Sequence, residues 1–346
     1  MATPVSTSPP KSAVTLFGAY GHTARFVIAE LLRRGITPIL AGRDSTKLDA
    51  LAEKYPTLQR RVASVDDPAS LDRALQGAQV VVNWAGPFLD TAAPVIEAAL
   101  RARIHYVDVA AEQTAVFEIF QRDTERELQA DILVTPALAF YGGLSDLLAT
   151  AAMGDWESAD TISVAVALDS WLPTLGTRLT GERNPGQRFR FSGGKLARAD
   201  SRPNREWNFP EPFGLQEVAS VPLAESITMP RHLKVSEIYS YINVASLADV
   251  SNPETPAPTA VDERGRSAQV FLADVVVRRG GEERRAIARG QDIYWVTAPI
   301  VAEAVERILD GRFARLGAIA AGEAFDARAF LDSLTAAECL TIQYRS

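Results

Sequence analysis

The sequence predicts an α/β protein in which a doubly wound parallel sheet is followed by a second, mainly antiparallel α+β domain. Between residues 13 and 134, short β-branched runs alternate with stretches of helical periodicity, as parallel strands joined by crossover helices do. A glycine-rich segment directly follows the first of these runs. Beyond residue 150, longer segments alternate polar and apolar residues, which is typical of half-buried antiparallel strands.

The elements of the first domain follow from apolar periodicity and its end signals. Residues 13–17 are expected to form a buried strand, and residues 23–34 have an apolar helical face that ends at Gly35. Ser45 is expected to cap the next helix. Further strands are expected at 37–41, 61–63, 80–83, 105–107 and 132–134, and further helices at 45–55, 69–75, 91–102, 114–130 and 144–153. This alternation predicts a Rossmann-type sheet.

The second half has fewer but longer signals. Strands are expected at 161–168 and 267–277, with Gly280 and Gly281 at a hairpin turn and proline-rich loops at 203–222 and 252–258. A helix at 298–309 is expected to pack back on the first domain. These signals divide the chain into a disordered tail (1–12), a dinucleotide-binding Rossmann domain (13–150), a substrate or dimerisation domain (151–296) and C-terminal helices that return to the Rossmann domain (297–346).

Composition narrows the function classes. The 346 residues are 47% hydrophobic, enough for a sizeable core, and the net charge of −7 argues against nucleic acid or an anionic membrane as a partner. The apolar runs are shorter than the roughly 20 residues of a membrane span. Because Cys339 is the single cysteine and the three histidines are far apart, no metal site is expected. We expect a cytoplasmic homo-oligomer, a dimer, that acts on a small-molecule substrate.

The strongest chemical signal is the segment Gly18–Ala24 between the first strand and the first helix. Gly18 permits a tight turn, Gly21 lets the backbone approach a pyrophosphate, and Ala24 keeps the helix close to the strand. The N–H groups at the start of the helix would then bind the phosphates, and Thr23 can add a hydroxyl. Tyr20 and His22 complete the loop. A plain turn with two glycines is the alternative.

The end of the second strand indicates which dinucleotide would bind. An NAD site places an acidic residue there, whereas this chain has Gly42 and then Arg43. Arg43 can hold a 2′-phosphate through charge-assisted hydrogen bonds, with Ser45 and Lys47 as helpers, so the expected cofactor is NADP(H). Arg43 could instead be a solvated loop charge. Asp44 lies one residue late for the NAD role.

Two later loops are expected at the same site. Asp66 follows the third strand, where it would meet the adenine edge or instead cap the helix that begins near Pro68. The fourth strand ends at Asn83, and the loop after it should pass under the nicotinamide ribose. The residues expected to contact the cofactor from this loop are Asn83, Ala85, Gly86 and Pro87.

Four segments together resemble the saccharopine dehydrogenase-like NADP-binding oxidoreductase family, which also includes trans-acting enoyl reductases: Gly18–Thr23, Leu40–Arg43, Val82–Phe88 and His105–Val109. The resemblance covers residues 13–150 well and extends more loosely to Arg289–Tyr294 and Thr297–Pro299. It implies NADP(H) binding and a substrate domain inserted before a returning C-terminal helix.

The chain departs from this family in two respects. Many relatives have Gly-Glu after the His-Tyr-Val-Asp segment, where this chain has Ala110-Ala111-Glu112. The chain is also too short for the substrate domain of the larger saccharopine enzymes, so saccharopine is not the expected substrate. The resemblance therefore implies a cofactor but not a substrate.

Three residues are candidates for the chemistry beside the nicotinamide. Tyr141 follows the sixth strand at a Gly142-Gly143 junction expected to be flexible, and its hydroxyl could donate a proton during hydride transfer or only pack as an aromatic lid. Asp108 and Glu112 could orient substrate, although Asp108 could equally accept hydrogen bonds from backbone N–H groups. We therefore expect an NADPH-dependent reductase of a C=C, C=N or C=O bond in a small or moderately apolar molecule. A non-catalytic NADP-binding regulator or partner protein is the alternative.

Overall fold

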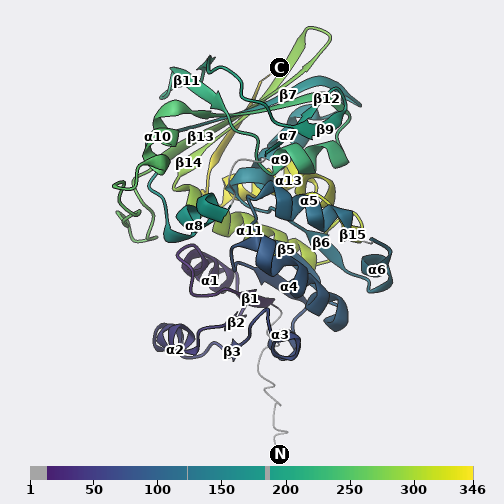
Figure 1. Cartoon of the computed structure of the whole chain (residues 1–346), viewed down its shortest axis with the longest axis vertical. Helices are drawn as coiled ribbons and strands as arrows, with labels where there is room; N and C mark the ends of the chain where they lie inside the picture. The colour runs from purple at the N-terminus through teal and green to yellow at the C-terminus, as the bar shows by residue number, and fades with distance from the viewer. Residues whose placement is uncertain (1–13, 123, 184–187, 346) are drawn as a thin grey trace, which may run out of the picture.

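The computed structural model describes residues 14–122, 124–183 and 188–345. The predicted tail at 1–12 lies outside these residues. Two sheets are stacked along the long axis of the molecule, and a layer of helices lies between them (Figure 1). The first sheet contains the N-terminal strands, and the second contains most strands after residue 158.

The first sheet has the strand order β15-β6-β5-β4-β1-β2-β3, and every pair in it is parallel. Except for β15, this is the order of a Rossmann sheet, which confirms the predicted fold class. One edge strand of this sheet, β15, comes from the C-terminal part of the chain and pairs with β6. The strands are β1 (Val14–Phe17), β2 (Pro38–Gly42), β3 (Arg60–Val62), β4 (Val80–Asn83), β5 (His105–Asp108), β6 (Leu133–Thr135) and β15 (Gly317–Ala318).

The helices of this domain differ from the prediction at two points. Asp44, not Ser45, caps the second helix: its backbone is extended and its carboxylate accepts a hydrogen bond from the N–H of Lys47 at 3.1 Å. The single helix expected at 114–130 is two helices, because the backbone turns to an extended conformation at Arg122. The helices are α1 (Ala24–Arg33), α2 (Ser45–Lys54), α3 (Pro68–Leu75), α4 (Phe88–Ala102), α5 (Gln113–Gln121) and α6 (Thr124–Gln129).

The second sheet is antiparallel except where β12 pairs with β7 in parallel. Gly280 and Gly281, with φ of +55° and +90°, form the predicted hairpin turn between β13 and β14. The segment 203–222, expected as a loop, contains two strands that extend one edge of the sheet. The strands are β7 (Ala159–Leu168), β8 (Phe189–Ser192), β9 (Lys195–Arg198), β10 (Arg205–Asn208), β11 (Leu215–Ser220), β12 (Val235–Asn243), β13 (Val270–Arg279), β14 (Glu282–Gln291) and β16 (Thr341–Arg345).

The remaining helices connect the two sheets or border the second one. They are η1 (Phe140–Leu144), α7 (Ser145–Met153), α8 (Leu175–Arg183), α9 (Glu225–Thr228), η2 (Met229–Arg231), α10 (Val244–Ser251), α11 (Ile293–Leu309), α12 (Ala321–Ala324) and α13 (Ala327–Ala336). Within the described residues, no helix combines the length and hydropathy that crossing a bilayer requires.

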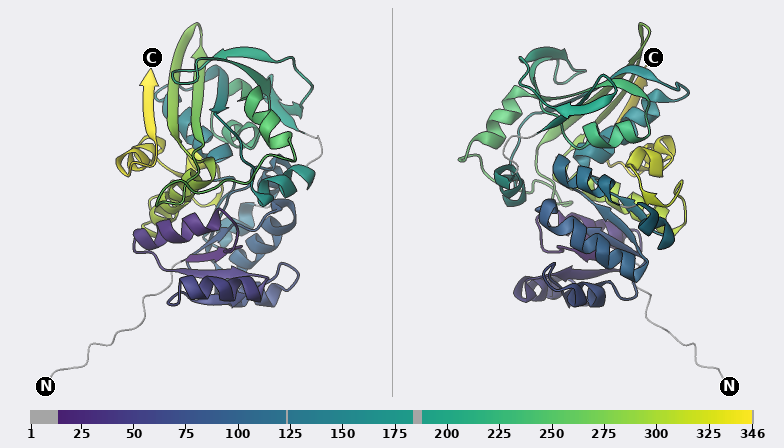
Figure 2. Two further views of the ribbon diagram at one scale, coloured as in Figure 1. Left: turned by 90° about the vertical axis from the view of Figure 1, so that its left-hand side faces the viewer. Right: turned by 45° about the vertical axis from the view of Figure 1, so that its right-hand side comes forward.

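Helix α11 lies against α1 and joins the two halves of the molecule (Figure 2). It begins five residues before the predicted helix at 298–309, because the Asp292 carboxylate accepts hydrogen bonds from the N–H groups of Tyr294 and Trp295. Its buried Val301 belongs to the same apolar core as Leu16 of β1 and Phe271 of β13. One continuous core therefore extends from the first sheet to the second.

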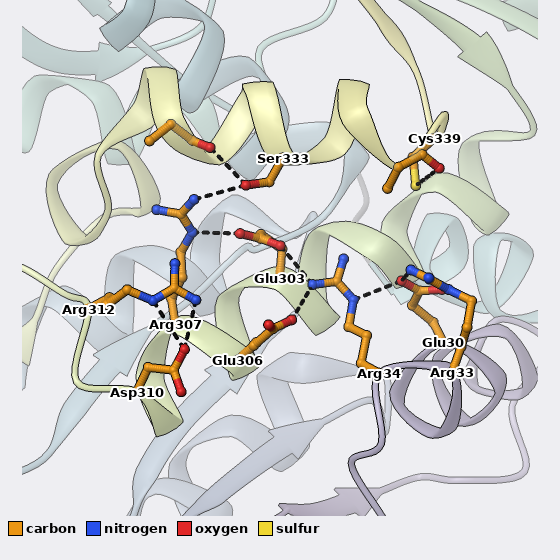
Figure 3. Close-up of polar contacts among 12 residues, drawn as sticks. Glu30, Arg33, Arg34, Glu303, Glu306, Arg307, Asp310, Arg312, Ser333 and Cys339 are labelled. Carbon is orange, nitrogen blue, oxygen red and sulfur yellow. Dashed lines mark hydrogen bonds and ion pairs between the residues drawn. The ribbon is translucent and has the colours of Figure 1, made fainter.

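Ion pairs connect α11 to the end of α1, and a hydrogen bond connects α11 to α13, at one border of this core (Figure 3). The Arg34 guanidinium, just after α1, donates hydrogen bonds to Glu30, to Glu303 at 2.7 Å and to Glu306 at 2.6 Å. Glu303 also accepts one from Arg307, which reaches Ser333 of α13. The Arg34 and Glu303 side chains are only 9% and 6% exposed, so this pair is largely shielded from water.

We predict that replacing Arg34 with methionine lowers the free energy of unfolding by about 3 kcal/mol, because the buried Glu303 carboxylate would lose one of its two cationic partners. Urea denaturation at neutral pH measures this loss. Burial raises the pKa of Glu303, but its hydrogen bonds to Arg34 and Arg307 outweigh burial and hold that pKa below the usual value. The stability from this carboxylate is thus present above its unfolded pKa and lost as pH falls, so wild type and variant should converge in acid.

Arg312 provides the matched control, because its pair with Asp310 near the end of α11 is exposed (Figure 3). Arg312→Met should change the free energy of unfolding by less than about 1 kcal/mol. Equal losses for the two variants, or a loss for Arg34→Met that does not shrink in acid, would contradict the buried ion pair's role.

Candidate functional site

A cavity of about 1130 Å³ lies at the carboxyl edge of the first sheet and is walled by both domains. The loops after β1, β2 and β4 line one part of it. The loops after β3, β5 and β6 also contribute, and segments of the second domain around α8 and α10, together with the start of α11, line the opposite part. This is the edge at which open parallel sheets bind ligands.

The loop after β1 has two glycines with different roles. Gly18 has a φ of +88°, and a Cβ atom there would lie 2.7 Å from the backbone nitrogen of Ala85, so the contact between the β1 and β4 loops requires glycine. At Gly21 a Cβ atom would meet no protein atom closer than 3.6 Å. Packing inside the protein therefore does not require Gly21, and its open side faces the cavity.

The start of α1 is open to an anion. No side chain caps this helix, and its first turn has no acidic residue. His22 and Thr23, just before the helix, line the cavity together with Gly18 and Tyr20. A helix N-terminus with its dipole directed at a cavity suits a phosphate, so this loop fits the pyrophosphate of a dinucleotide.

The end of β2 brings two cations to the rim of the cavity. Arg43 and Lys47 both line it, and Arg43 is exposed with no ion pair to any described residue. The ring of Tyr20 lies on Gly42, where a Cβ atom would be 2.5 Å from that ring. Asp44 is engaged as the cap of α2 and forms an ion pair with Lys47 at 3.5 Å. The unpaired charge beside the cavity is therefore cationic, as a 2′-phosphate requires.

A buried polar network holds the loop after β4. The Asn83 side chain accepts a hydrogen bond from the Ala85 N–H and donates to the hydroxyls of Thr91 and Tyr106. Tyr106 in turn donates to Asp108 at 2.8 Å. Asn83 is thus fully buried and shapes the loop, whereas Ala85, Gly86 and Pro87 of the same loop line the cavity.

Asp108 does not reach the cavity. It is completely buried and accepts hydrogen bonds from the N–H groups of Ala110 and Ala137, at 3.0 and 2.8 Å. Burial raises the pKa of Asp108, and these bonds and the one from Tyr106 oppose that shift. Of the two roles expected for Asp108, these contacts match that of a carboxylate held by backbone N–H groups. Asp108 fixes the turn that leads from β6 to Tyr141.

Glu112 lines the cavity but is also engaged. Its carboxylate accepts a hydrogen bond at 3.2 Å from the N–H of Phe88, the first residue of α4. Only 4% of Glu112 is exposed, and burial, with a smaller contribution from Asp108, raises its pKa. Its second oxygen has no hydrogen bond from a described residue, so Glu112 retains some capacity to contact a ligand.

Tyr141 stands between the two domains and lines the cavity. Its ring stacks on Trp171 of the second domain, with centroids 5.5 Å apart. Its hydroxyl is buried and has no hydrogen-bond partner among the described residues. Burial, and then the nearby Tyr294 and Glu225, raise the pKa of this phenol well above its ordinary value, so it stays protonated.

The glycines after Tyr141 are tightly packed rather than flexible. A Cβ atom on Gly142 would lie 2.9 Å from the carbonyl oxygen of Ala137, and one on Gly143 would lie 2.9 Å from the Cα of Leu138. The expectation of a flexible junction was wrong. The glycines allow the turn to fold closely on itself, which fixes the position of Tyr141.

Tyr294, at the start of α11, organises the wall from the second domain. Its hydroxyl accepts hydrogen bonds from the indole N–H of Trp171 at 3.2 Å and from the N–H of Thr174, and it bonds the Thr177 hydroxyl at 2.9 Å. These contacts hold the start of α8 over the cavity. The same wall has many apolar side chains, namely Trp171, Leu175, Leu179, Val221, Leu223, Ile242, Leu247 and Val250.

The structure brings most of the predicted site residues together. Around the cavity lie Gly18, Tyr20, Gly21, His22, Thr23, Gly42, Arg43, Ala85, Gly86, Pro87, Glu112 and Tyr141. Five predicted residues do not line it: Ala24 is buried inside α1, Ser45 and Asp66 are exposed next to lining residues, and Asn83 and Asp108 are buried beneath the loops. Asp66 interacts with Ser64, and the helix cap considered for it is supplied by Asp67.

The sequence prediction missed several lining residues, including Trp84, Gln113, Arg188 and Thr297. Trp84 lies inside the motif that drew attention to its neighbours, and Tyr294 and Thr297 lie in the late segments of the family resemblance. Gln113 and Arg188 had no local signal.

Comparison with known proteins agrees with this geometry. Residues 14–133 match the family model of the saccharopine dehydrogenase NADP binding domain. Among curated proteins, the chain is 27% identical over 152 residues to the saccharopine dehydrogenase-like oxidoreductase of Bos taurus and 32% identical over 117 residues to that of Homo sapiens. The matches cover 39% and 29% of this chain, and only 35% and 27% of the two relatives.

A solved structure extends the similarity of fold to nearly the whole chain. The saccharopine dehydrogenase (L-Glu forming) from Saccharomyces cerevisiae superposes with a TM-score of 0.68 at 13% identity, covering 96% of this chain and 99% of the yeast chain. The inserted second domain is therefore part of the shared fold. The segment that carries the phosphate loop and Arg43, residues 14–133, matches the model of the saccharopine dehydrogenase NADP binding domain, which confirms the predicted family resemblance and its cofactor, NADP(H).

Proposed function

We propose that this protein is an NADPH-dependent oxidoreductase that reduces a C=C, C=N or C=O bond of a small, moderately apolar substrate. The observation that carries the proposal is one cavity that extends from the N-terminus of α1 to Tyr141, whose hydroxyl has no hydrogen-bond partner among the described residues. A dinucleotide bound along the first part would extend toward that hydroxyl.

The cofactor would be held by groups that packing leaves available. The loop at Gly18–Thr23 and the start of α1 would bind the pyrophosphate, and Arg43 with Lys47 would bind the 2′-phosphate. The loop at Ala85–Pro87, fixed from below by Asn83, would support the nicotinamide ribose. When bound, NADPH supplies the hydride.

The chain's own groups would supply the proton and exclude water. Tyr141 keeps its proton at neutral pH and has no competing acceptor among the described residues, so it can donate to the substrate atom that becomes basic as the bond is reduced. Its stacking on Trp171 limits its movement. The apolar wall of the second domain favours a substrate with apolar surface and keeps the reacting groups dry.

The cytoplasmic location and the homodimer expected from the sequence stay predictions. One measurement distinguishes the reductase from the alternative expected from the sequence, a non-catalytic NADP-binding protein. A panel of enones, imines and ketones is tested for oxidation of bound NADPH, and binding of NADPH without oxidation by any of them would favour the alternative.

The first prediction from the proposed function concerns the choice of cofactor. NADPH should bind more tightly than NADH by about 1–3 kcal/mol, because Arg43 makes a charge-assisted contact that only the 2′-phosphate can accept. Calorimetric titration of wild type and Arg43→Ala measures the difference, most of which the substitution should remove. Arg60→Ala, an exposed arginine of β3 paired with Asp49, is the control and should preserve it. Equal affinities in the wild type would contradict the assignment.

The second prediction concerns the phosphate loop. Gly21→Val should abolish cofactor binding while leaving the melting temperature nearly unchanged, because the added side chain extends toward the pyrophosphate site rather than into protein atoms. Gly18→Val is the contrasting variant and should destabilise the fold, since its Cβ atom meets the Ala85 backbone. Cofactor binding by a folded Gly21→Val protein would exclude this loop from the site.

The third prediction concerns Tyr141. Tyr141→Phe should lower turnover at least about tenfold, equivalent to about 1.4 kcal/mol in the barrier, with unchanged affinity for NADPH. His105→Asn is the control, because His105 accepts a hydrogen bond from the Leu133 N–H and does not line the cavity. Full turnover in the Tyr141→Phe variant would mean that Glu112 or solvent, and not Tyr141, donates the proton.

A further inference from the structure

A second, much smaller cavity lies on the far side of Tyr141, between η1, β12 and the loop before α9. Its volume is about 10 Å³, room for a single water molecule. Four residues line both this cavity and the main one: Tyr141, Val221, Leu223 and Ile242. The phenol therefore forms part of the partition between the large cavity and a water-sized space.

Three polar groups around this small cavity are buried without a hydrogen-bond partner in the described part of the chain: the Tyr141 hydroxyl, the Ser240 hydroxyl and the Oε2 atom of Glu225. They come from η1, β12 and α9, and η1 lies about 80 residues before the other two elements. A buried polar group left unpaired costs about 1–3 kcal/mol. One water molecule can make two to four hydrogen bonds, which is enough to satisfy all three groups.

Glu225 has few contacts for a buried carboxyl. It is 2% exposed, and its Oε1 atom accepts one hydrogen bond, from the Leu223 N–H at 3.2 Å. Burial raises the pKa of Glu225, while the adjacent Ser240 hydroxyl, which does not reach hydrogen-bond geometry, opposes the shift together with backbone N–H groups and the charge of Arg188. With only one backbone hydrogen bond of good geometry, this carboxyl can hold a proton on its unpaired oxygen.

We propose that the small cavity binds one water molecule, and that Glu225, through this water and Ser240, resupplies the proton that Tyr141 gives to the substrate. The role in turnover rests on the proposed reductase function, whereas the water site and the protonated carboxyl do not. Glu225 is a positioning and relay residue here, since it touches neither substrate nor cofactor.

The proton steps balance without any further reactant. As NADPH supplies two electrons with its hydride, the O–H bond of Tyr141 breaks and a new bond to hydrogen forms at the substrate. The phenolate then takes a proton from the trapped water, which takes one from the carboxyl of Glu225. The Glu225 carboxylate regains a proton from solvent after the product leaves, so the net input is one hydride and one solvent proton.

The first test needs no substrate. An infrared difference spectrum of wild type minus Glu225→Gln at neutral pH should contain the carbonyl band of one protonated carboxyl. A high-resolution crystal structure of the wild type should contain a water molecule within hydrogen-bond distance of Tyr141, Ser240 and Glu225. Ser163→Ala is the control, because Ser163 of β7 is also buried but lines neither cavity. An ionised Glu225, or a cavity without that water, would overturn the proposal even in an active reductase.

The second test uses turnover of a substrate found in the panel. Glu225→Gln and Ser240→Ala should each lower kcat about tenfold with little change in KM or NADPH affinity, and a multi-proton solvent isotope effect in the wild type should become a single-proton effect in Glu225→Gln. Ser163→Ala should match the wild type. Unchanged kcat in both relay variants, or an unchanged isotope effect, would refute the relay. If Glu225→Gln does not fold, the kcat of Ser240→Ala and the wild-type crystal structure test the relay instead. Absence of any substrate would refute the reductase function but leave the first test decisive for the water site.

Discussion

The packing of α11 on α1 fixes the geometry on which the cavity depends. One face of the first sheet is covered partly by a helix that begins almost 280 residues after β1 begins, and Leu16, Val301 and Phe271 share one core. Since β14 ends directly before α11, the position of this helix also places the second sheet. The buried contact between Arg34 and Glu303 gives the packing a defined register, because an apolar face alone would tolerate sliding. The wall built around Tyr294, near the N-terminus of α11, therefore lies over the carboxyl edge of the first sheet.

A second constraint acts inside the first domain, where one polar network serves two loops. Asn83 holds the loop after β4 through the N–H of Ala85, and Asp108 holds the turn after β6 through the N–H of Ala137. Tyr106 joins the two side chains. The same buried hydrogen bonds thus position the backbone expected to support the nicotinamide and the residue expected to donate a proton. The side chains of Asn83, Tyr106 and Asp108 do this without reaching the cavity.

The features predicted correctly from the sequence are those that local chemistry determines. The alternation of strands and helices, the turn at Gly18 and the hairpin at Gly280 depend on neighbouring residues, and the position of Arg43 needs only the end of β2. Prediction failed where distant contacts decide. Strands β10 and β11 form inside a proline-rich segment because an edge of the second sheet is available to them. Asp66 and Ser45 have suitable chemistry and spacing but are not among the lining residues, and Glu225 had no local signal at all.

Three buried carboxyls show why residue type alone could not assign roles at this site. Burial raises the pKa of Asp108, Glu112 and Glu225 alike, and hydrogen-bond donors oppose that shift to different extents. Asp108 accepts two backbone N–H groups and a phenol, so it is held as a fixed structural acceptor. Glu112 and Glu225 each accept one backbone N–H of good geometry. Glu112 lines the main cavity, whereas Glu225 lines the small cavity that Tyr141 also lines. The number of donors sets how readily a carboxyl can hold a proton, and the cavity it faces sets which groups it can exchange that proton with, so the relay proposed behind Tyr141 uses a residue that sequence reasoning had no reason to select.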